Sequence, residues 1–297
     1  MKMKSKEERI TQSIAHALLT ICSLLALIPF WLLISSSFTE EKTAIRTGYK
    51  FIPKVFSVAA YEYILGEWSQ IGRAYCVTIL VTLIGTVLGI LVVTMFAYGL
   101  SRKDVAGVKV VFLLVLVTML FNGGIVPSYY MYSNVLHIKN TIWALVLPNL
   151  LMNGFTVILV RSYMESNIPN ELIEAAEMDG CSQFGIFFKI VFPLSTPIVA
   201  TVGLLTGVGY WNDWNNGLYY ITNERLYSIQ QLLNKMNENI SFLSSNATNL
   251  TNISLEDIPS TTVRMAIAVV AILPIICIYP FFQKYFAKGI TMGAVKG

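Results

Sequence analysis

Residues 171–193 read ELIEAAEMDGCSQFGIFFKIVFP, and they form a strongly acidic segment in a chain that is otherwise largely apolar. Lys189 is the one basic residue within the segment, whereas four acidic residues fall within its first nine positions: Glu171, Glu174, Glu177 and Asp179. Long uncharged runs lie on both sides of it. The fold therefore depends on what those runs are, and on which side of them this acidic segment lies.

The composition of the chain is that of a membrane protein. Of its 297 residues 55% are hydrophobic and 13% are charged, whereas a soluble domain has about 25% charged residues. The net charge of +4 is dispersed along the chain, which argues against a nucleic-acid partner. Four cysteines lie far apart in the sequence, so we expect neither a metal site nor a disulfide framework.

Uncharged runs predict the membrane-spanning segments. About 20 residues of helix cross a hydrocarbon core of ~30 Å, and a spanning segment must satisfy its backbone hydrogen bonds internally. We therefore predict an all-α integral membrane protein with six transmembrane helices. The third run divides near Phe121, where a Gly-, Pro- and Tyr-containing stretch begins. The six runs are 10–39, 74–101, 110–138, 140–160, 190–212 and 265–283.

The distribution of Lys and Arg predicts the orientation. With a cytoplasmic N-terminus, the inner segments hold 12 of the 21 basic residues in roughly a third of the extramembrane positions. We expect a multi-pass protein of the cell membrane, in contact with lipid and with both termini cytoplasmic. The expected parts are a cytoplasmic N-terminus at 1–12, a transmembrane domain at 13–285 with a cytoplasmic loop at 162–190 and an external loop at 215–262, and a cytoplasmic tail at 286–297.

The acidic segment then lies in the cytoplasm, where an anionic membrane surface would not attract it. The stretch at 167–170, NIPN, has the residues of a helix start, and Glu171 and Glu174 near that start suit the helix dipole. Gly180 is suited to a left-handed end, after which the apolar piece 184–192 leads back to the membrane. We predict two short helices joined at a glycine. One face would hold Leu172, Ala175, Ala176 and Asp179, with the alanines keeping it flat for a protein partner.

The same residues resemble a known family. The permease subunits of ATP-binding-cassette importers carry the pattern EAA, three residues, Gly, nine residues, Ile, one residue and Leu-Pro. Phe192 stands here where that family usually has leucine. The alternative is a solvated amphipathic loop between two spans, and six matching positions argue against it. The matching residues are Glu174, Ala175, Ala176, Gly180, Ile190 and Pro193.

The resemblance extends along most of the chain. The stretches at 96–107, 127–148, 211–221 and 288–297 look like the corresponding parts of sugar permeases. The chain most resembles the permeases of lipoprotein-dependent oligosaccharide and polysaccharide uptake. The resemblance implies a type I importer (MetI-like) transmembrane domain, paired with a second permease subunit, two ATPase subunits and an extracytoplasmic solute-binding protein, and carrying a glycan substrate. It also implies that the tail, with Gly293, Lys296 and Gly297, reaches between the ATPase subunits.

The resemblance further implies how the loop works. Glu174 would pair with a basic ATPase residue, the face with Asp179 would pack in an ATPase cleft, and Gly180 would permit the bend. The chain has no G-x-x-x-x-G-K-[ST] phosphate loop and no hydrolase signature. ATP and Mg²⁺ are therefore expected on a separate ATPase. This chain is not expected to be an enzyme or to hold a cofactor or a metal. The alternative is an ion-coupled secondary carrier or a channel that acts without an ATPase.

Polar residues within and beside the spans are candidates for the substrate path. Asn149 and Asn153 lie one turn apart, and either contact with sugar hydroxyls or ties between helices would account for them. GxxxG spacing at 85–89 and 203–207 predicts close helix packing. Aromatic and polar side chains at the outer end of the fifth run suit a sugar ring, an interfacial aromatic belt or a docked binding protein. They are Tyr210, Trp211, Asn212, Asp213 and Trp214.

Overall fold

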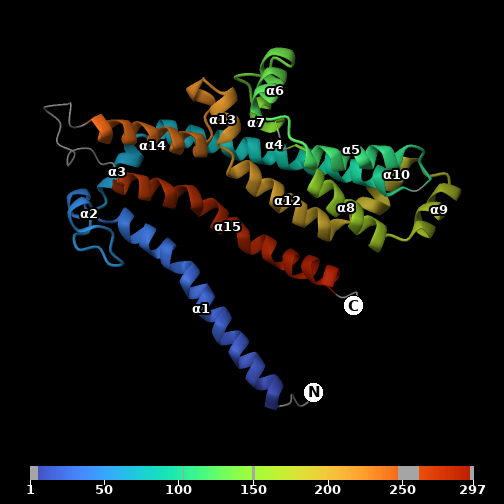
Figure 1. Cartoon of the computed structure of the whole chain (residues 1–297), viewed down its shortest axis with the longest axis horizontal. Coiled ribbons are helices and arrows are strands. Elements are labelled where there is room, and N and C mark those ends of the chain that lie inside the picture. The colour runs from blue at the N-terminus through green and yellow to red at the C-terminus, as the bar shows by residue number, and fades with distance from the viewer. Residues whose placement is uncertain (1–5, 103, 149–150, 247–260, 295–297) are drawn as a thin grey trace. The chain divides into compact units, whose positions relative to one another are not determined.

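The computed structural model describes residues 6–102, 104–148, 151–246 and 261–294, and the regular elements within these ranges are helices (Figure 1). This agrees with the predicted all-α class. The chain divides into two compact units, each built from two separate parts of the sequence. The first comprises Met1–Ser69 with Lys235–Leu273, and the second comprises Gln70–Asn234 with Pro274–Gly297.

The first unit contains α1 (Lys6–Ser37), α2 (Glu41–Thr47), α3 (Ala59–Gly66) and parts of α14 (Ile229–Asn246) and α15 (Thr261–Ala294). The apolar side chains of α1 are largely exposed, as expected of a helix that faces lipid or another chain. After α1, the ring of Phe38 stacks on the rings of Phe56 and Tyr61 and so holds these parts of the segment together. The carboxylate of Glu41 accepts hydrogen bonds from the backbone N–H groups of Thr261 and Thr262, each at 2.8 Å, and so caps the start of α15.

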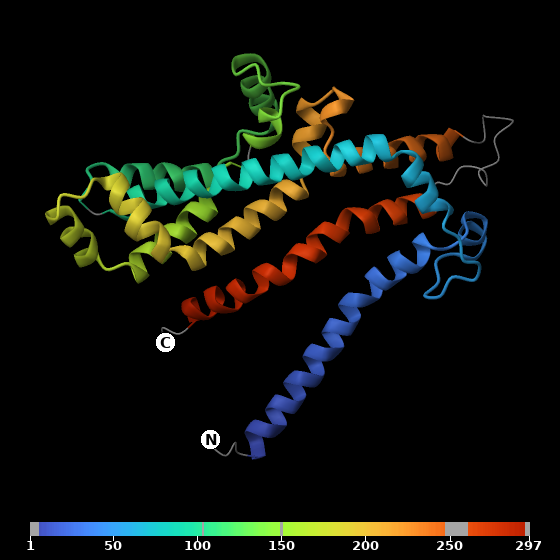
Figure 2. The ribbon, with the colours of Figure 1, turned by 180° about the vertical axis from the view of Figure 1, so that it is seen from behind.

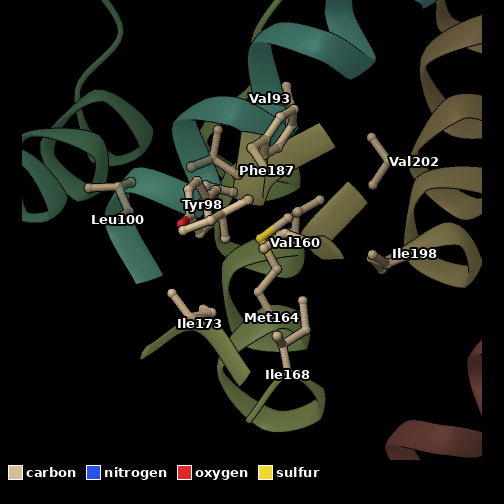
Figure 3. Packing of buried hydrophobic residues seen from close by; sticks show 14 of the residues in the cluster. Val93, Tyr98, Leu100, Val160, Met164, Ile168, Ile173, Phe187, Ile198 and Val202 are labelled. Carbon is tan, nitrogen blue, oxygen red and sulfur yellow. The ribbon is translucent and has the colours of Figure 1, made fainter. Parts of the chain in front are cut away.

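The second unit is built around α4 (Trp68–Ser101), and both views show α5 (Val108–Leu120), α8 (Gly154–Asn167) and α12 (Thr196–Trp211) running alongside it (Figures 1 and 2). Their apolar faces enclose one hydrophobic core. Figure 3 labels ten of its residues: Val93, Tyr98, Leu100, Val160, Met164, Ile168, Ile173, Phe187, Ile198 and Val202.

Helices α4 and α12 approach each other through glycines on both sides, which confirms the close packing predicted from the GxxxG spacing. A β-carbon at Gly203 would lie 2.9 Å from Cδ1 of Ile90, and one at Gly89 would lie 3.3 Å from Cγ2 of Thr206. One at Gly207 would lie 3.3 Å from Oγ1 of Thr86. Any larger residue at these positions would push the helices apart.

The number of spans is only partly tested by this structure. Two helices are long and apolar enough to cross a membrane, Ile10–Ser37 and Trp68–Ser101. The count rises to four if each bent pair of helices is one span, and a shorter apolar helix covers Thr261–Cys277. These counts refer to the described part of the chain, and the number six stays a prediction.

The bend in the third run is confirmed. Helix α5 ends at Leu120, and the helical stretch Ile125–Val135 then turns away by 114°. That stretch consists of α6 (Ile125–Tyr130) and a π-helical turn, η1 (Met131–Val135).

The prediction of a single helix over 140–160 is wrong. The structure has the short α7 (Trp143–Val146) and then α8, which begins only at Gly154 and continues to Asn167, well past the expected end. Pro148 lies in the break, and Asn153 adopts an extended conformation and caps α8. Part of the expected external loop, 215–262, is also helical, because α13 (Asn215–Tyr220) and α14 lie within it.

Candidate functional site

The inner loop has the bent form that its sequence predicts. Helix α9 (Asn170–Met178) ends just before Gly180, whose φ of +80° is left-handed, and α10 (Gln183–Ile186) follows. The backbone N–H groups of Gly180 and Cys181 donate to the carbonyls of Glu177 and Ala176 at 2.9 and 3.0 Å, which closes the end of α9. The helix start differs in detail, since Pro169 occupies the N-cap position and no side chain caps the helix.

Helix α9 divides its residues between solvent and the protein's own core. Glu174, Ala175, Asp179 and Gly180 are exposed, whereas Ala176 is 8% exposed and packs in the core beside Ile173. The expectation that both alanines lie on one open face is therefore wrong. With 3.6 residues per turn, positions 173 and 176 face the bundle and position 175 turns toward solvent.

The return limb of the loop is anchored by aromatic residues. Helix α10 continues into a π-helical turn, η2 (Phe187–Val191), and the short α11 (Phe192–Leu194), and the chain then bends by 83° into α12. The buried ring of Phe187 lies 5.8 Å from that of Tyr98 on α4 (Figure 3). Of the two remaining motif residues, Ile190 is partly buried beside the core and Pro193 is exposed.

Arg102, at the end of α4, holds the two limbs of the inner loop. Its Nη2 donates to Oε1 of Glu177 on α9 at 2.7 Å, and its Nη1 donates to Oε1 of Gln183 on α10 at 3.2 Å. The same guanidinium forms a bidentate pair with Asp104, at 2.7 and 2.6 Å. In the sequence, Arg102 is one of the basic residues that predict the orientation, and spacing gives no sign that residues 102 and 177 meet.

The charges of this cluster shift one another's titration. Hydrogen bonds from Gln183 and then from Arg102 lower the pKa of Glu177. The pKa of Asp104 is lowered by its hydrogen bonds with Arg102. Glu177 is thus engaged within the chain, which leaves Glu174 and Asp179 as the exposed carboxylates of the motif.

At the other end of α12, the proposed substrate-path residues separate into two groups. Tyr210 and Trp211 are 2% and 5% exposed, and the Tyr210 hydroxyl donates to the carbonyl of Val146 at 2.8 Å. These two rings therefore pack inside the unit. Asn212 and Trp214 are exposed, and Trp214 retains 41% of its surface.

Asp213 lies just beyond the end of α12, and burial raises the pKa of its carboxyl to about 6. Its Oδ1 accepts a hydrogen bond from the backbone N–H of Asn216 at 3.3 Å, which works against that rise. The Asn216 side chain donates to the carbonyl of Pro148 at 3.0 Å. The turn after α12 is thereby tied to the break before α8.

Sequence analysis missed Asn140, which joins two outer segments. Its Oδ1 accepts from the backbone N–H groups of Thr222 and Asn223 at 2.7 and 3.1 Å, and its own N–H donates to the carbonyl of Tyr220 at 3.0 Å. Its φ of +59° is left-handed, a conformation that Asn tolerates better than most residues.

The other candidates give a mixed result. Asn153 serves the helix, since its Oδ1 accepts from the N–H of Phe155 at 2.8 Å, and Asn149 lies outside the described residues. Gly293 lies in the last turn of α15, whereas Lys296 and Gly297 lie outside the description. Within the described ranges, no three His, Cys, Asp or Glu side chains gather as a metal site.

Comparison with known proteins shows the family to which this chain is similar. Residues 105–292 match the family model described as "Binding-protein-dependent transport system inner membrane component". The chain is 36% identical, over 98% of its length and 100% of the relative's, to the polygalacturonan/rhamnogalacturonan transport system permease protein YtcP of Bacillus subtilis.

Two further matches agree with the first. The arabinooligosaccharides transport system permease protein AraQ of Bacillus subtilis is 29% identical, with 93% of this chain and 92% of the relative covered. Among solved structures, a chain of a bacterial ABC transporter involved in the import of the acidic polysaccharide alginate aligns with a TM-score of 0.78. That alignment has 30% identity and covers 96% of this chain and 100% of the other.

Proposed function

This chain belongs to the family of binding-protein-dependent transport system inner membrane components, and from that membership we propose that it is the permease subunit of an ATP-driven glycan importer. The observation that carries the proposal is the full-length match to a polysaccharide-transport permease. As a permease subunit it is a multi-pass membrane protein and not itself an enzyme.

The proposed assembly contains a second permease subunit, two ATPase subunits that bind ATP and Mg²⁺, and an extracytoplasmic solute-binding protein. Its transmembrane domain has six spanning helices and both termini in the cytoplasm, with the loop at 162–190 on the inner side. The excess of Lys and Arg in the inner segments supports that orientation.

In this assembly α9 and α10 form the coupling loop, which enters a cleft of an ATPase subunit. Glu174 pairs there with a basic ATPase residue, while Ala175 and Asp179 pack against the cleft; all three are exposed and positioned to reach a partner. Gly180 allows the sharp bend, and Ile190 and Pro193 lead the chain back toward α12. The C-terminal residues Gly293, Lys296 and Gly297 reach between the two ATPase subunits.

The proposed substrate is an oligosaccharide or a polysaccharide fragment. Relatives named for polygalacturonan/rhamnogalacturonan, arabinooligosaccharides and alginate support this class. At the outer end of α12, Asn212 and Trp214 have the exposure needed to meet a sugar or the binding protein, whereas Tyr210 and Trp211 support that surface from inside.

Copurification and uptake together test the proposal. The chain is tagged in its native host, and the complex is examined for a second permease and an ATPase. Uptake of labelled galacturonan, arabinan and alginate oligosaccharides is then compared in cells with and without this chain, and with and without the ATPase.

The expected result is a complex that contains both partners and uptake of at least one glycan that needs both this chain and the ATPase. An ion-coupled carrier would instead transport alone. Glycan uptake that depends on this chain but persists without the ATPase would therefore refute the proposal.

A further inference from the structure

We propose that Arg102 is a positioning residue that makes α4 move together with the coupling loop during the transport cycle. The inference rests on the proposed function, because it assumes that an ATPase moves the loop. Three partners on three separate elements carry it: Glu177 on α9, Gln183 on α10 and Tyr98 on α4.

The guanidinium of Arg102 is well placed to act as a fixed junction. Its side chain is 12% exposed, and its Nη2 lies 2.7 Å from Glu177 and 2.6 Å from Asp104. Charge-assisted hydrogen bonds in such a partly buried place are stronger and more directional than those of an exposed ion pair. A lysine in this position could not reproduce the fork of bonds that arginine makes.

The junction is closed by bonds that do not involve Arg102 itself. The side-chain amide of Gln183 donates to the same Oε1 of Glu177 at 2.7 Å, and the Tyr98 hydroxyl donates to Oε1 of Gln183 at 3.0 Å. These bonds orient Glu177 and Gln183 toward the guanidinium, and the bonds from Arg102 complete the link between both limbs of the coupling loop and the end of α4. Beneath this polar layer, the ring of Phe187 packs against that of Tyr98.

This junction changes the route by which motion can reach the membrane. The loop is joined covalently to α8 and to α12, and it has no short covalent link to α4. A hydrogen-bonded link at Arg102 lets a displaced loop carry α4 as well. Since α4 also packs against α12 through glycines, the helices would shift as one body.

A neighbouring ion pair serves as a matched control. Arg161 pairs with Glu165 at 2.7 Å within α8, and the Nε of Arg161 separately donates to the carbonyl of Leu100 on α4 at 3.0 Å, a bond that does not use Glu165. Glu165 is 30% exposed and Glu177 is 35% exposed, so the two carboxylates lie in comparable surroundings. Glu165→Gln therefore removes a paired charge at the same end of the molecule and leaves the junction intact.

The test measures a distance in the assembled complex. Spin labels are placed at Val87→Cys on α4 and Met178→Cys on α9, both exposed positions, after the four native cysteines are replaced by serine. Electron–electron distances are recorded in lipid nanodiscs, first without nucleotide and then with Mg·ATP and vanadate. The same complex is assayed for ATP hydrolysis.

With Arg102 present, and equally with Glu165→Gln, we expect one narrow distance distribution that is the same in both nucleotide states. Arg102→Ala and Glu177→Gln should give a distribution that shifts when nucleotide is added, while ATP hydrolysis continues. A contact with a merely structural role would alter both states alike. If Arg102→Ala shows the narrow, unchanged distribution of the wild type, the inference is wrong even though the proposed function stands.

Two further results distinguish a failure of this inference from a failure of the proposed function. If the wild-type chain copurifies with no ATPase, it is the proposed function that fails. If Arg102→Ala does not assemble, Glu177→Gln decides, because it removes only the charged partner on α9 and leaves the pair between Arg102 and Asp104 in place. A distribution that shifts with nucleotide supports the inference, and one that stays narrow and unchanged overturns it.

Discussion

The ring of Tyr210 on α12 occupies the space that a β-carbon would need at Gly85 on α4. The ring is held there, because its hydroxyl donates to the carbonyl of Val146 and the side chain is 2% exposed. Contact between the two helices thus depends on a glycine on one of them and on a fixed aromatic ring on the other. This arrangement is the most direct consequence of the small residues noted in the sequence.

Gly85→Ala should destabilise the second unit, because the added methyl group collides with a ring that cannot turn away. Inserting a methyl group into a close-packed site costs ~1–3 kcal/mol. Gly99→Ala is the control on the same helix, since nothing lies within 4 Å of its β-carbon position. It should stabilise the helix by at most ~1 kcal/mol. Thermal unfolding in detergent measures both, and equal shifts in Tm would contradict this account of the packing.

Gly180→Val should impair coupling through backbone strain alone. The φ of Gly180 is +80°, and nothing lies within 4 Å of its β-carbon position. A left-handed conformation costs an L-residue ~1–2 kcal/mol, and less for Asn. Gly180→Asn should therefore retain more uptake than Gly180→Val, and both should insert normally.

Gly107→Val is the matched control for that experiment, since Gly107 has a φ of +84° and equally open surroundings. It carries the same type of strain outside the coupling loop. Glycan uptake and copurification of the ATPase are measured for all three variants. Equal losses for Gly107→Val and Gly180→Val would show that the strain acts on general stability and not on coupling.

Asp213→Asn should stabilise the protein at neutral pH. The pKa of Asp213 is raised to about 6, above its ordinary value near 4, so the folded state holds a proton that the unfolded state has already lost. Stability therefore falls as the pH rises from about 4 to 6, by at most ~3 kcal/mol, and stays at that lower level above pH 6. The asparagine variant should lack this fall. Tm measured from about pH 4 to pH 8 tests the sign.

Asp104→Asn should have the opposite sign at neutral pH. Arg102 lowers the pKa of Asp104, so its charge stabilises the folded state above about pH 4 and that contribution is lost as the pH falls further. At pH 7 the Tm of this variant should drop while that of Asp213→Asn rises. A rise in both would contradict a stabilising role for the pair between Arg102 and Asp104.

Asn140→Ala should loosen the segment around Thr222. It removes an acceptor used by two backbone N–H groups and places alanine at a φ of +59°. Asn140→Gly separates the two causes, because glycine removes the side chain without backbone strain. Because these bonds are exposed, water can replace the lost acceptor, and each bond is worth about 0.5–1.5 kcal/mol. Limited proteolysis between 220 and 228 should speed up for both variants, and unchanged cleavage of Asn140→Gly would contradict a role for the side chain.

The sequence was most informative where one residue type has one physical use. The left-handed Gly180 and the close approach at Gly203 follow from the absence of a side chain, and the structure confirms both. The bend at Phe121 follows from the glycines after it and is confirmed as well. The inner loop was therefore predicted in outline.

Contacts between distant parts of the chain could not be predicted. Arg102 meets Glu177 across 75 positions and Asn140 meets Thr222 across 82, and no periodicity connects such pairs. Hydropathy predicts one helix over 140–160, because it does not register that Pro148 interrupts the helix or that Asn153 caps the start of α8. The burial of Tyr210 depends on the glycine opposite, which only the packing of two helices reveals.

The hydrogen bonds that Glu41 accepts from Thr261 and Thr262 join positions 220 and 221 residues apart. During translation, the early helices leave the ribosome long before the partner of that carboxylate exists. The first unit therefore stays incomplete until the start of the last helix has been synthesised. Nascent chains truncated before residue 261 would lack this closure and present their early helices, α1 above all, to chaperones and membrane proteases.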